Sequence, residues 1–162
     1  MEKKKLYAAI VGYGNRGQVY GDYSLQCPDE FGVAAVIDPK EFKLREAKER
    51  YGLSDERLFY DFASFLKSGI ECDFVINATM DQFHYETTME ILGAGYDLLV
   101  EKPIVPNEKE LLDIKNLAEK KGVRVFVCHV LRYSPFYTKI KEILNSGVIG
   151  KIMTMEMNEH VC

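Results

Sequence analysis

Short apolar runs alternate with amphipathic stretches along most of the 162-residue chain. Most of the apolar runs are bounded by Gly, Pro, Asn or Asp, which is typical of short strands buried on both faces. In the stretches between them, apolar residues recur at the three- and four-residue spacing of a helix. We therefore expect strands at 6–11, 33–37, 58–60, 74–76, 97–100 and 123–127.

The stretches between these runs carry the signals of helix ends. Asp61 and Asp81 can cap the starts of two helices, and Pro135 suits the first turn of another. Helices are expected near 16–24, 41–51, 62–68, 83–92, 108–121 and 135–144. Strand and helix in turn predict the α/β class, as a Rossmann-type doubly wound parallel sheet with helices on both faces.

The first strand runs into a glycine-rich turn, G-Y-G-N-R-G, at residues 12–17, and a helix can begin at about Asn15. This order of strand, turn and helix is the context that a dinucleotide-binding fingerprint requires. Gly12 permits the tight turn, Gly14 leaves room for a pyrophosphate, and Gly17 lets the helix lie close to the strand. The helix N-terminus then favours an anion. A glycine turn with a purely structural role is the alternative.

An acidic residue at the end of the second expected strand strengthens the nucleotide interpretation. Asp38 directly follows the apolar run 33–37. A carboxylate about 20 residues beyond the turn can accept hydrogen bonds from an adenosine ribose. It favours NAD over NADP because it repels a 2′-phosphate, although Lys40 weakens that preference. The alternative is an ordinary aspartate at the end of a strand.

Composition and charge exclude several classes of protein. The chain has 21 Lys and Arg against 25 Asp and Glu, and no basic stripe supports nucleic-acid binding. No apolar segment approaches the length of a membrane span, so we expect no membrane association. The basic residues 3–5 lead into an apolar run without a cleavage site, which predicts a cytoplasmic location. The four cysteines and three histidines lack zinc-site spacing, so no metal is expected.

Polar residues follow the fourth expected strand, at the sheet edge where ligands of such folds bind. Thr79 can hydrogen-bond a nucleotide that passes beside it. His84 either contributes to the same site or simply faces solvent at the start of a helix. The sequence leaves both alternatives open.

Two further groups follow the fifth and sixth expected strands. Lys102 stands before Pro103, which biases it to an extended conformation, and a lysine in a cleft can pass protons. A surface lysine in a turn is the alternative. Arg132 and Tyr133 can line the cleft and bind an oxygen-rich substrate, or they can serve as a surface ion pair and as packing.

Taken together, these motifs resemble the Gfo/Idh/MocA family of oxidoreductases, which includes relatives of glucose–fructose oxidoreductase and inositol dehydrogenase. Glu101-Lys102-Pro103 is the most specific sign. Where the family commonly has Pro-Asn, this chain has Met80-Asp81. The motifs in order are the turn at 12–17, Asp38, the segment 78–84, the tripeptide at 101–103 and Arg132-Tyr133-Ser134-Pro135.

The resemblance implies a nicotinamide dinucleotide cofactor and hydride transfer at the CH–OH carbon of a sugar or polyol. It makes Lys102 the catalytic residue beside the nicotinamide and the substrate hydroxyl. The cofactor contacts that it implies are Gly12, Gly14, Asn15, Arg16, Gly17, Asp38, Thr79, His84, Glu101, Lys102 and Arg132. NAD is the expected cofactor, with NADP second.

The resemblance covers only the N-terminal half of a family member. We assign residues 1–150 to an NAD(P)-binding Rossmann domain and 151–162 to the start of a truncated α/β substrate domain. The segment 151–157 alternates polar with apolar residues and predicts a strand. Its open edge favours a homo-oligomer. Because half of the pocket is missing, we expect this chain to bind cofactor without turnover.

Three other functions fit the same residues. One is a redox-neutral glycosidase or lyase of the family, which uses bound NAD transiently. Another is a non-enzymatic NAD-binding regulatory module. The last is an S-adenosylmethionine methyltransferase, which also has a glycine turn and an acidic residue after the second strand, although the tripeptide at 101–103 argues against it.

Overall fold

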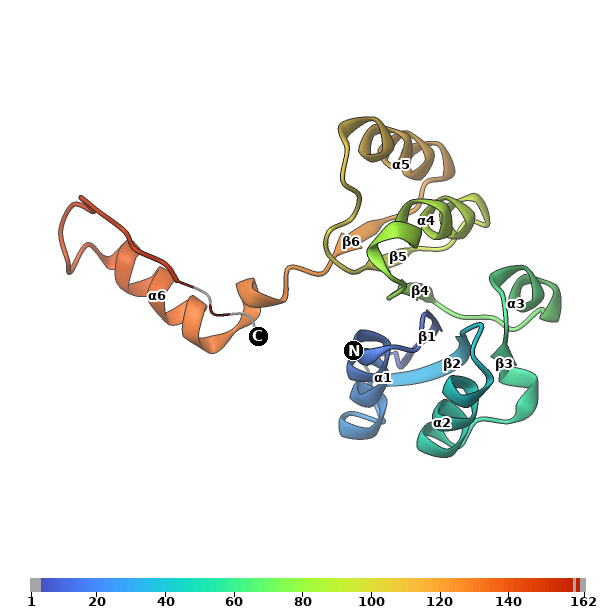
Figure 1. The fold of residues 1–162 in the computed structure, drawn as a ribbon. Helices are drawn as coiled ribbons and strands as arrows, with labels where there is room; N and C mark the ends of the chain where they lie inside the picture. Colours follow the sequence, from blue (N-terminus) through green and yellow to red (C-terminus); the bar gives the residue numbers. More distant parts are fainter. Residues whose placement is uncertain (1–3, 159, 161–162) are drawn as a thin grey trace. The chain divides into compact units, whose positions relative to one another are not determined.

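The computed structural model describes residues 4–158 and 160. Its centre is a six-stranded parallel sheet with the order β3-β2-β1-β4-β5-β6 (Figure 1). The strands are β1 (Leu6–Val11), β2 (Phe31–Ile37), β3 (Leu58–Phe59), β4 (Phe74–Asn77), β5 (Leu98–Val100) and β6 (Val125–Val127). The order reverses between β1 and β4, which places a ligand crevice beyond their carboxyl ends. The predicted doubly wound sheet is confirmed.

Helices cover both faces of this sheet, and two clusters of buried side chains hold them there. The helices are α1 (Asn15–Gln26), α2 (Glu41–Tyr51), α3 (Phe62–Ser68), α4 (His84–Gly93) and α5 (Glu108–Lys121), with short 3-10 turns η1 (Asp55–Arg57) and η2 (Asp81–Phe83). Leu44 and Ala47 of α2 pack with Ile10 of β1 on one face. On the other face, Phe65 of α3 and Ile91 of α4 join a cluster that includes α5. None of the described helices is long and apolar enough to cross a membrane.

Several element ends differ from their predicted positions, and strand pairing or a backbone hydrogen bond explains two of the differences below. Helix α1 extends to Gln26, two residues beyond the expected end. Strand β2 begins at Phe31 rather than at residue 33, since Phe31 is buried and pairs with Leu6 of β1. Strand β6 begins at Val125 because the Val123 N–H donates to the Ala118 carbonyl and so closes the end of α5.

The helix caps test the local predictions. Asp61 caps α3 as expected, and its carboxylate accepts a hydrogen bond from the Ser64 N–H at 2.7 Å. The expected cap at Asp81 is wrong, because Asp81 opens the turn η2 and α4 begins three residues later at His84. Asn107 caps α5 by accepting from the Glu110 N–H at 2.9 Å.

Contacts between residues divide the chain into two compact units, Met1–Cys128 and His129–Cys162, whereas the sequence analysis grouped residues 1–150. The second unit contains η3 (Val130–Tyr133) and α6 (Pro135–Ser146), which confirms the helix expected from Pro135.

The strand expected at 151–157 is wrong, because the described residues 151–158 form no regular element. A strand needs a neighbour to complete its ladder, and none pairs with this segment among the described residues. The case for self-association through its edge therefore loses its basis.

Candidate functional site

The glycine turn at the end of β1 is held by contacts that only glycine permits. Gly12 has a φ of +88°, and a Cβ there would lie 2.6 Å from the Ala78 carbonyl oxygen. A Cβ on Gly17 would lie 2.2 Å from the Gly12 carbonyl oxygen. These two glycines therefore bring β1, the loop after β4 and the start of α1 close together, as expected for a nucleotide-binding turn.

Gly14 differs from its two neighbours, because a Cβ there would meet no atom of the described chain within 4 Å. Packing inside the chain therefore does not require glycine at this position. Gly14 is also the N-cap of α1, where no side chain in the described structure accepts from the first N–H groups. Open space at an uncapped helix N-terminus suits the diphosphate of a dinucleotide.

Asp38 follows β2 and joins it to the turn. It is only 8% exposed, and one carboxylate oxygen accepts from the Tyr13 N–H at 2.8 Å. The other oxygen accepts from the Lys40 N–H at 2.9 Å. An ionised carboxylate has about four acceptor positions, so these two hydrogen bonds leave capacity for ribose hydroxyls. The Asp38 carboxylate can therefore hold a ribose while also fixing the turn.

The loop after β4 is organised by a buried amide. Asn77 is fully buried, and its Oδ1 accepts from the Thr79 hydroxyl at 2.7 Å. Its Nδ2 donates to the Thr88 hydroxyl at 3.1 Å. The Asn77 carbonyl accepts from the Glu101 N–H at 3.0 Å, which ties this loop to the end of β5. Thr79 thus lies at the sheet edge, where its half-buried side chain is already hydrogen-bonded within the chain.

His84 occupies neither of the positions that the sequence allowed. It is fully buried, with Nδ1 2.6 Å from the Pro103 carbonyl oxygen and Nε2 3.1 Å from the Thr79 carbonyl oxygen. Both ring nitrogens face acceptors inside the protein. The placement differs from the expected cofactor contact and from the solvent-facing alternative.

The end of β5 carries a buried carboxylate beside an exposed lysine. Glu101 is 5% exposed, and its Oε2 accepts from the Lys102 backbone N–H at 3.0 Å. Its Oε1 accepts a short hydrogen bond from the Tyr20 hydroxyl and lies 3.6 Å from the Arg16 Nε. Burial raises the pKa of the Tyr20 phenol, and the neighbouring Cys128 and Glu101 add to this effect, so Tyr20 remains a donor. The Lys102 side chain is exposed at the same edge.

The sequence profile of a known family fits this arrangement. The profile described as "Oxidoreductase family, NAD-binding Rossmann fold", of the Gfo/Idh/MocA group, matches residues 6–129. The chain belongs to the Gfo/Idh/MocA family of oxidoreductases. It is the NAD-binding Rossmann domain of that family, which removes the methyltransferase alternative.

Individual relatives agree with the family match. The chain is 28% identical over 91% of its length to Oxidoreductase P35 of Formosa agariphila, of which it covers 45%. It is also 28% identical over 93% of its length to an inositol 2-dehydrogenase/D-chiro-inositol 3-dehydrogenase of Lactiplantibacillus plantarum, of which it covers 43%. The structure of an NAD-binding protein from Listeria innocua superposes with a TM-score of 0.79 at 28% identity, over 91% of this chain and 42% of that one. The chain therefore spans under half the length of these relatives.

Within this Gfo/Idh/MocA domain, the structure brings most of the predicted residues to one edge of the sheet. The turn, Asp38, Thr79 and Lys102 all follow the carboxyl ends of strands in the first compact unit. Arg16 lies in the first turn of α1 and pairs with Glu101. Arg132 belongs to the second unit, so its cofactor contact stays a prediction.

Sequence reasoning missed Tyr20 and Asn77, which connect the parts of the candidate site. A signal for Tyr20 existed, because it lies three residues after Gly17 and so shares a helix face with it. Asn77 ends an apolar strand and is fully buried, and a buried amide needs several partners. Neither residue reveals its partner in the sequence, since Tyr20 is far along the chain from Glu101.

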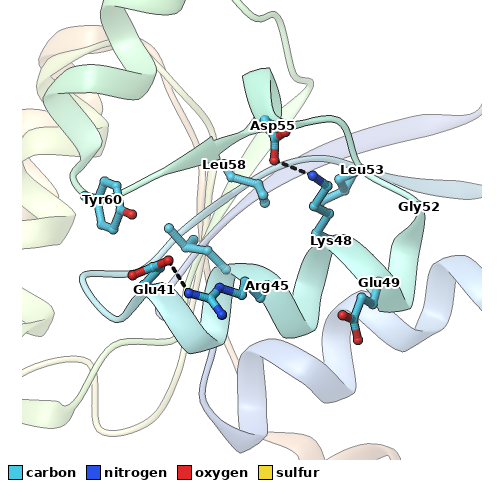
Figure 2. Close-up of a pocket in the computed structure, with 10 residues that line it drawn as sticks. Glu41, Arg45, Lys48, Glu49, Gly52, Leu53, Asp55, Leu58 and Tyr60 are labelled. Atoms are coloured by element: carbon cyan, nitrogen blue, oxygen red, sulfur yellow. Dashed lines mark hydrogen bonds and ion pairs between the residues drawn. The ribbon is translucent and has the colours of Figure 1, made fainter.

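A large surface hollow lies away from these residues. It has a volume of about 890 Å³ and is built from α2 and the segments that follow it (Figure 2). Four of its five charged side chains are paired with one another, Arg45 with Glu41 and Lys48 with Asp55. The lining contains none of the predicted site residues, so the hollow is separate from the candidate cofactor site.

Proposed function

We propose that this chain is the cofactor-binding half of an NAD-dependent oxidoreductase that moves a hydride between the nicotinamide and the CH–OH carbon of a sugar or polyol. One observation carries the proposal. The open turn at Gly14, the carboxylate of Asp38 and the exposed Lys102 follow β1, β2 and β5 of a single parallel sheet. The inositol dehydrogenase relative supports a polyol substrate.

The residues at the turn fit a dinucleotide. The uncapped N-terminus of α1 would receive the diphosphate, and Asp38 would accept hydrogen bonds from the adenosine ribose. We expect NAD rather than NADP because the Asp38 carboxylate lies where a 2′-phosphate would approach. The exposed Lys40 reduces this preference without reversing it, since only its backbone N–H contacts Asp38 in the structure.

Lys102 would take up the proton of the substrate hydroxyl. The bound nicotinamide supplies the hydride acceptor or donor. The Lys102 side chain, as the neutral amine, would hold the substrate hydroxyl and accept its proton during oxidation. Its backbone is anchored to the Glu101 carboxylate, so the flexible four-carbon stem extends from a fixed position. For the chain by itself we expect cofactor binding without turnover.

Thermal unfolding with NADH, NAD and NADPH tests the cofactor site. NADH at about 100 times its dissociation constant should add about 2.7 kcal/mol and raise the melting temperature by several degrees. Asp38→Asn should abolish most of this shift. Because Asp38 also holds the Tyr13 N–H, the melting temperature of the variant without ligand is measured as well.

Asp73→Asn is the matched control. Asp73 also receives a backbone N–H, from Tyr7 at 2.8 Å, but it precedes β4 at the opposite edge of the sheet. This variant should melt lower and keep the full NADH shift. An equal loss of the shift in both variants, or no shift in the folded parent chain, would contradict the proposed site.

The redox-neutral and regulatory alternatives share the cofactor site, so substrate oxidation separates them. The full-length protein is incubated with polyols and NAD while NADH is followed by absorbance. Net NADH formation supports the proposal. Tightly held NAD with no net NADH would point to redox-neutral chemistry, and exchangeable NAD without any reaction would point to a regulatory module.

A further inference from the structure

The buried ring of His84 lies between two loops of the candidate site. Its Nδ1 is 2.6 Å from the carbonyl oxygen of Pro103, in the loop after β5. Its Nε2 is 3.1 Å from the carbonyl oxygen of Thr79, in the loop after β4. A carbonyl oxygen only accepts hydrogen bonds, so a ring N–H must donate in each such bond, and the shorter contact places an N–H on Nδ1.

These contacts hold the backbone on both sides of the Lys102 side chain. On one side, the Lys102 N–H donates to Glu101 at 3.0 Å. On the other side, the carbonyl of the next residue, Pro103, faces His84. Glu101 is anchored in turn by the hydroxyl of Tyr20 from α1, and His84 begins α4. The backbone on either side of Lys102 is therefore held by contacts to two helices, α1 and α4, which cover opposite faces of the sheet.

We propose that His84 is a positioning residue, which fixes the backbone at Lys102 and so places its terminal amino group at the nicotinamide end of the site. This inference rests on the proposed function. His84 does not contact the cofactor itself, because its side chain is fully buried and both ring nitrogens face carbonyl oxygens of the chain.

The chemistry of the side chain supports this role over simple packing. A phenylalanine would fill a similar volume, but it would leave the Pro103 carbonyl without the contact that holds it. The Pro103 carbonyl would then take another donor or water, so the loop would lose the hydrogen bond that fixes it to α4. Lysine has a long, flexible stem, and its terminal nitrogen can be placed accurately only if its backbone is fixed.

Binding of two ligands by the 162-residue chain tests the role. NADH contains the nicotinamide, whereas ADP-ribose contains only the part that the turn and Asp38 would hold. His84→Phe should weaken the binding of NADH about tenfold, because NADH would lose one hydrogen bond from Lys102. The same variant should weaken the binding of ADP-ribose by less than about twofold. His84→Gln retains one N–H donor and should give an intermediate loss.

Two further variants separate positioning from general destabilisation. Ile91→Val shortens another fully buried side chain of α4, which packs in the apolar cluster and bonds none of the site's loops, and it should lower the melting temperature without changing the ratio of the two affinities. In a Lys102→Met background, His84→Gln should change the affinity for NADH by less than about twofold, because a residue that acts through Lys102 has a non-additive effect once that side chain is removed.

The outcomes distinguish the two proposals. If the His84 variants weaken NADH and ADP-ribose equally, or weaken NADH as strongly in the Lys102→Met background, His84 has only a structural role and the inference is overturned. If the folded parent chain binds neither ligand, the proposed function fails and the inference fails with it. A selective loss of NADH affinity that depends on Lys102 supports both the proposed function and the role of His84.

Discussion

The two halves of the candidate site are built on different principles. In the half that follows β1 and β2, backbone groups form the site: two glycines pack against carbonyl groups, and one carboxylate fixes the turn. In the half that follows β4 and β5, buried polar side chains hold the loops together, chiefly Asn77, His84 and Glu101. A backbone-built half is specified by residue type at fixed spacing, whereas a half built from side chains depends on partners that only the fold brings together.

The largest effect is expected at the glycine turn, where two neighbouring positions should respond differently. Gly12→Ala should lower the free energy of unfolding by about 3 kcal/mol or more, since it combines a positive φ with a backbone clash. Gly14→Ala should cost no more than about 1 kcal/mol, because its Cβ meets open space. Urea unfolding measures both changes.

Gly14→Ala also tests whether a ligand occupies the open space at Gly14. Gly14→Ala should weaken NADH binding by about tenfold or more in a chain of nearly normal stability, because the new methyl group would occupy the place of the diphosphate. Equal binding by Gly14→Ala and the parent chain would mean that the diphosphate does not lie there.

A smaller effect is expected where the two halves meet. Tyr20→Phe removes the hydroxyl that α1 donates to the buried Glu101, and it should lower the free energy of unfolding by about 1–2 kcal/mol. Tyr23→Phe is the control, since that hydroxyl donates to Glu30 in an exposed position on the same helix. We expect the control to change stability by less than about 0.5 kcal/mol. Similar losses in both variants would show that Tyr20 does not join the halves.

The smallest effect lies at the opposite edge of the sheet and appears in the pH dependence of stability. The ammonium of Lys4, together with the Tyr7 N–H, lowers the pKa of Asp73 in the folded chain. Asp73 therefore stabilises the fold fully above the ordinary carboxyl pKa of 3.8, and this contribution is lost as the pH falls through its lowered folded value. Asp73→Asn should cost about 1 kcal/mol at neutral pH.

Thermal unfolding of the parent chain and Asp73→Asn across the acidic range tests this sign. The melting temperatures of the two proteins should converge as the pH falls below the lowered pKa that Asp73 has in the folded chain, because Asp73 is then protonated in both the folded and the unfolded state. A difference that persists unchanged at low pH would mean that the carboxylate's charge does not stabilise the amino edge of the sheet.

Local sequence signals predicted the elements well where one residue decides the conformation. Asp61 caps α3, and α2 and α5 have their predicted bounds. Prediction failed where distant pairing decides. Phe31 joins β2 because it meets Leu6, and the segment 151–157 alternates like a strand but has no pairing partner among the described residues. The cap at Asp81 failed because a 3-10 turn intervenes before α4.

The sequence by itself determined the fold class, the turn at 12–17 and the place of Asp38 at the end of a strand, since glycine spacing and strand-end position act through the local backbone. Only the tertiary structure decided which groups the side chains of His84 and Glu101 contact. Their partners, Pro103 and Tyr20, come from other elements, and burial turns each contact into a requirement. A buried polar side chain must find its partner in space, and the chain order does not say where that partner is.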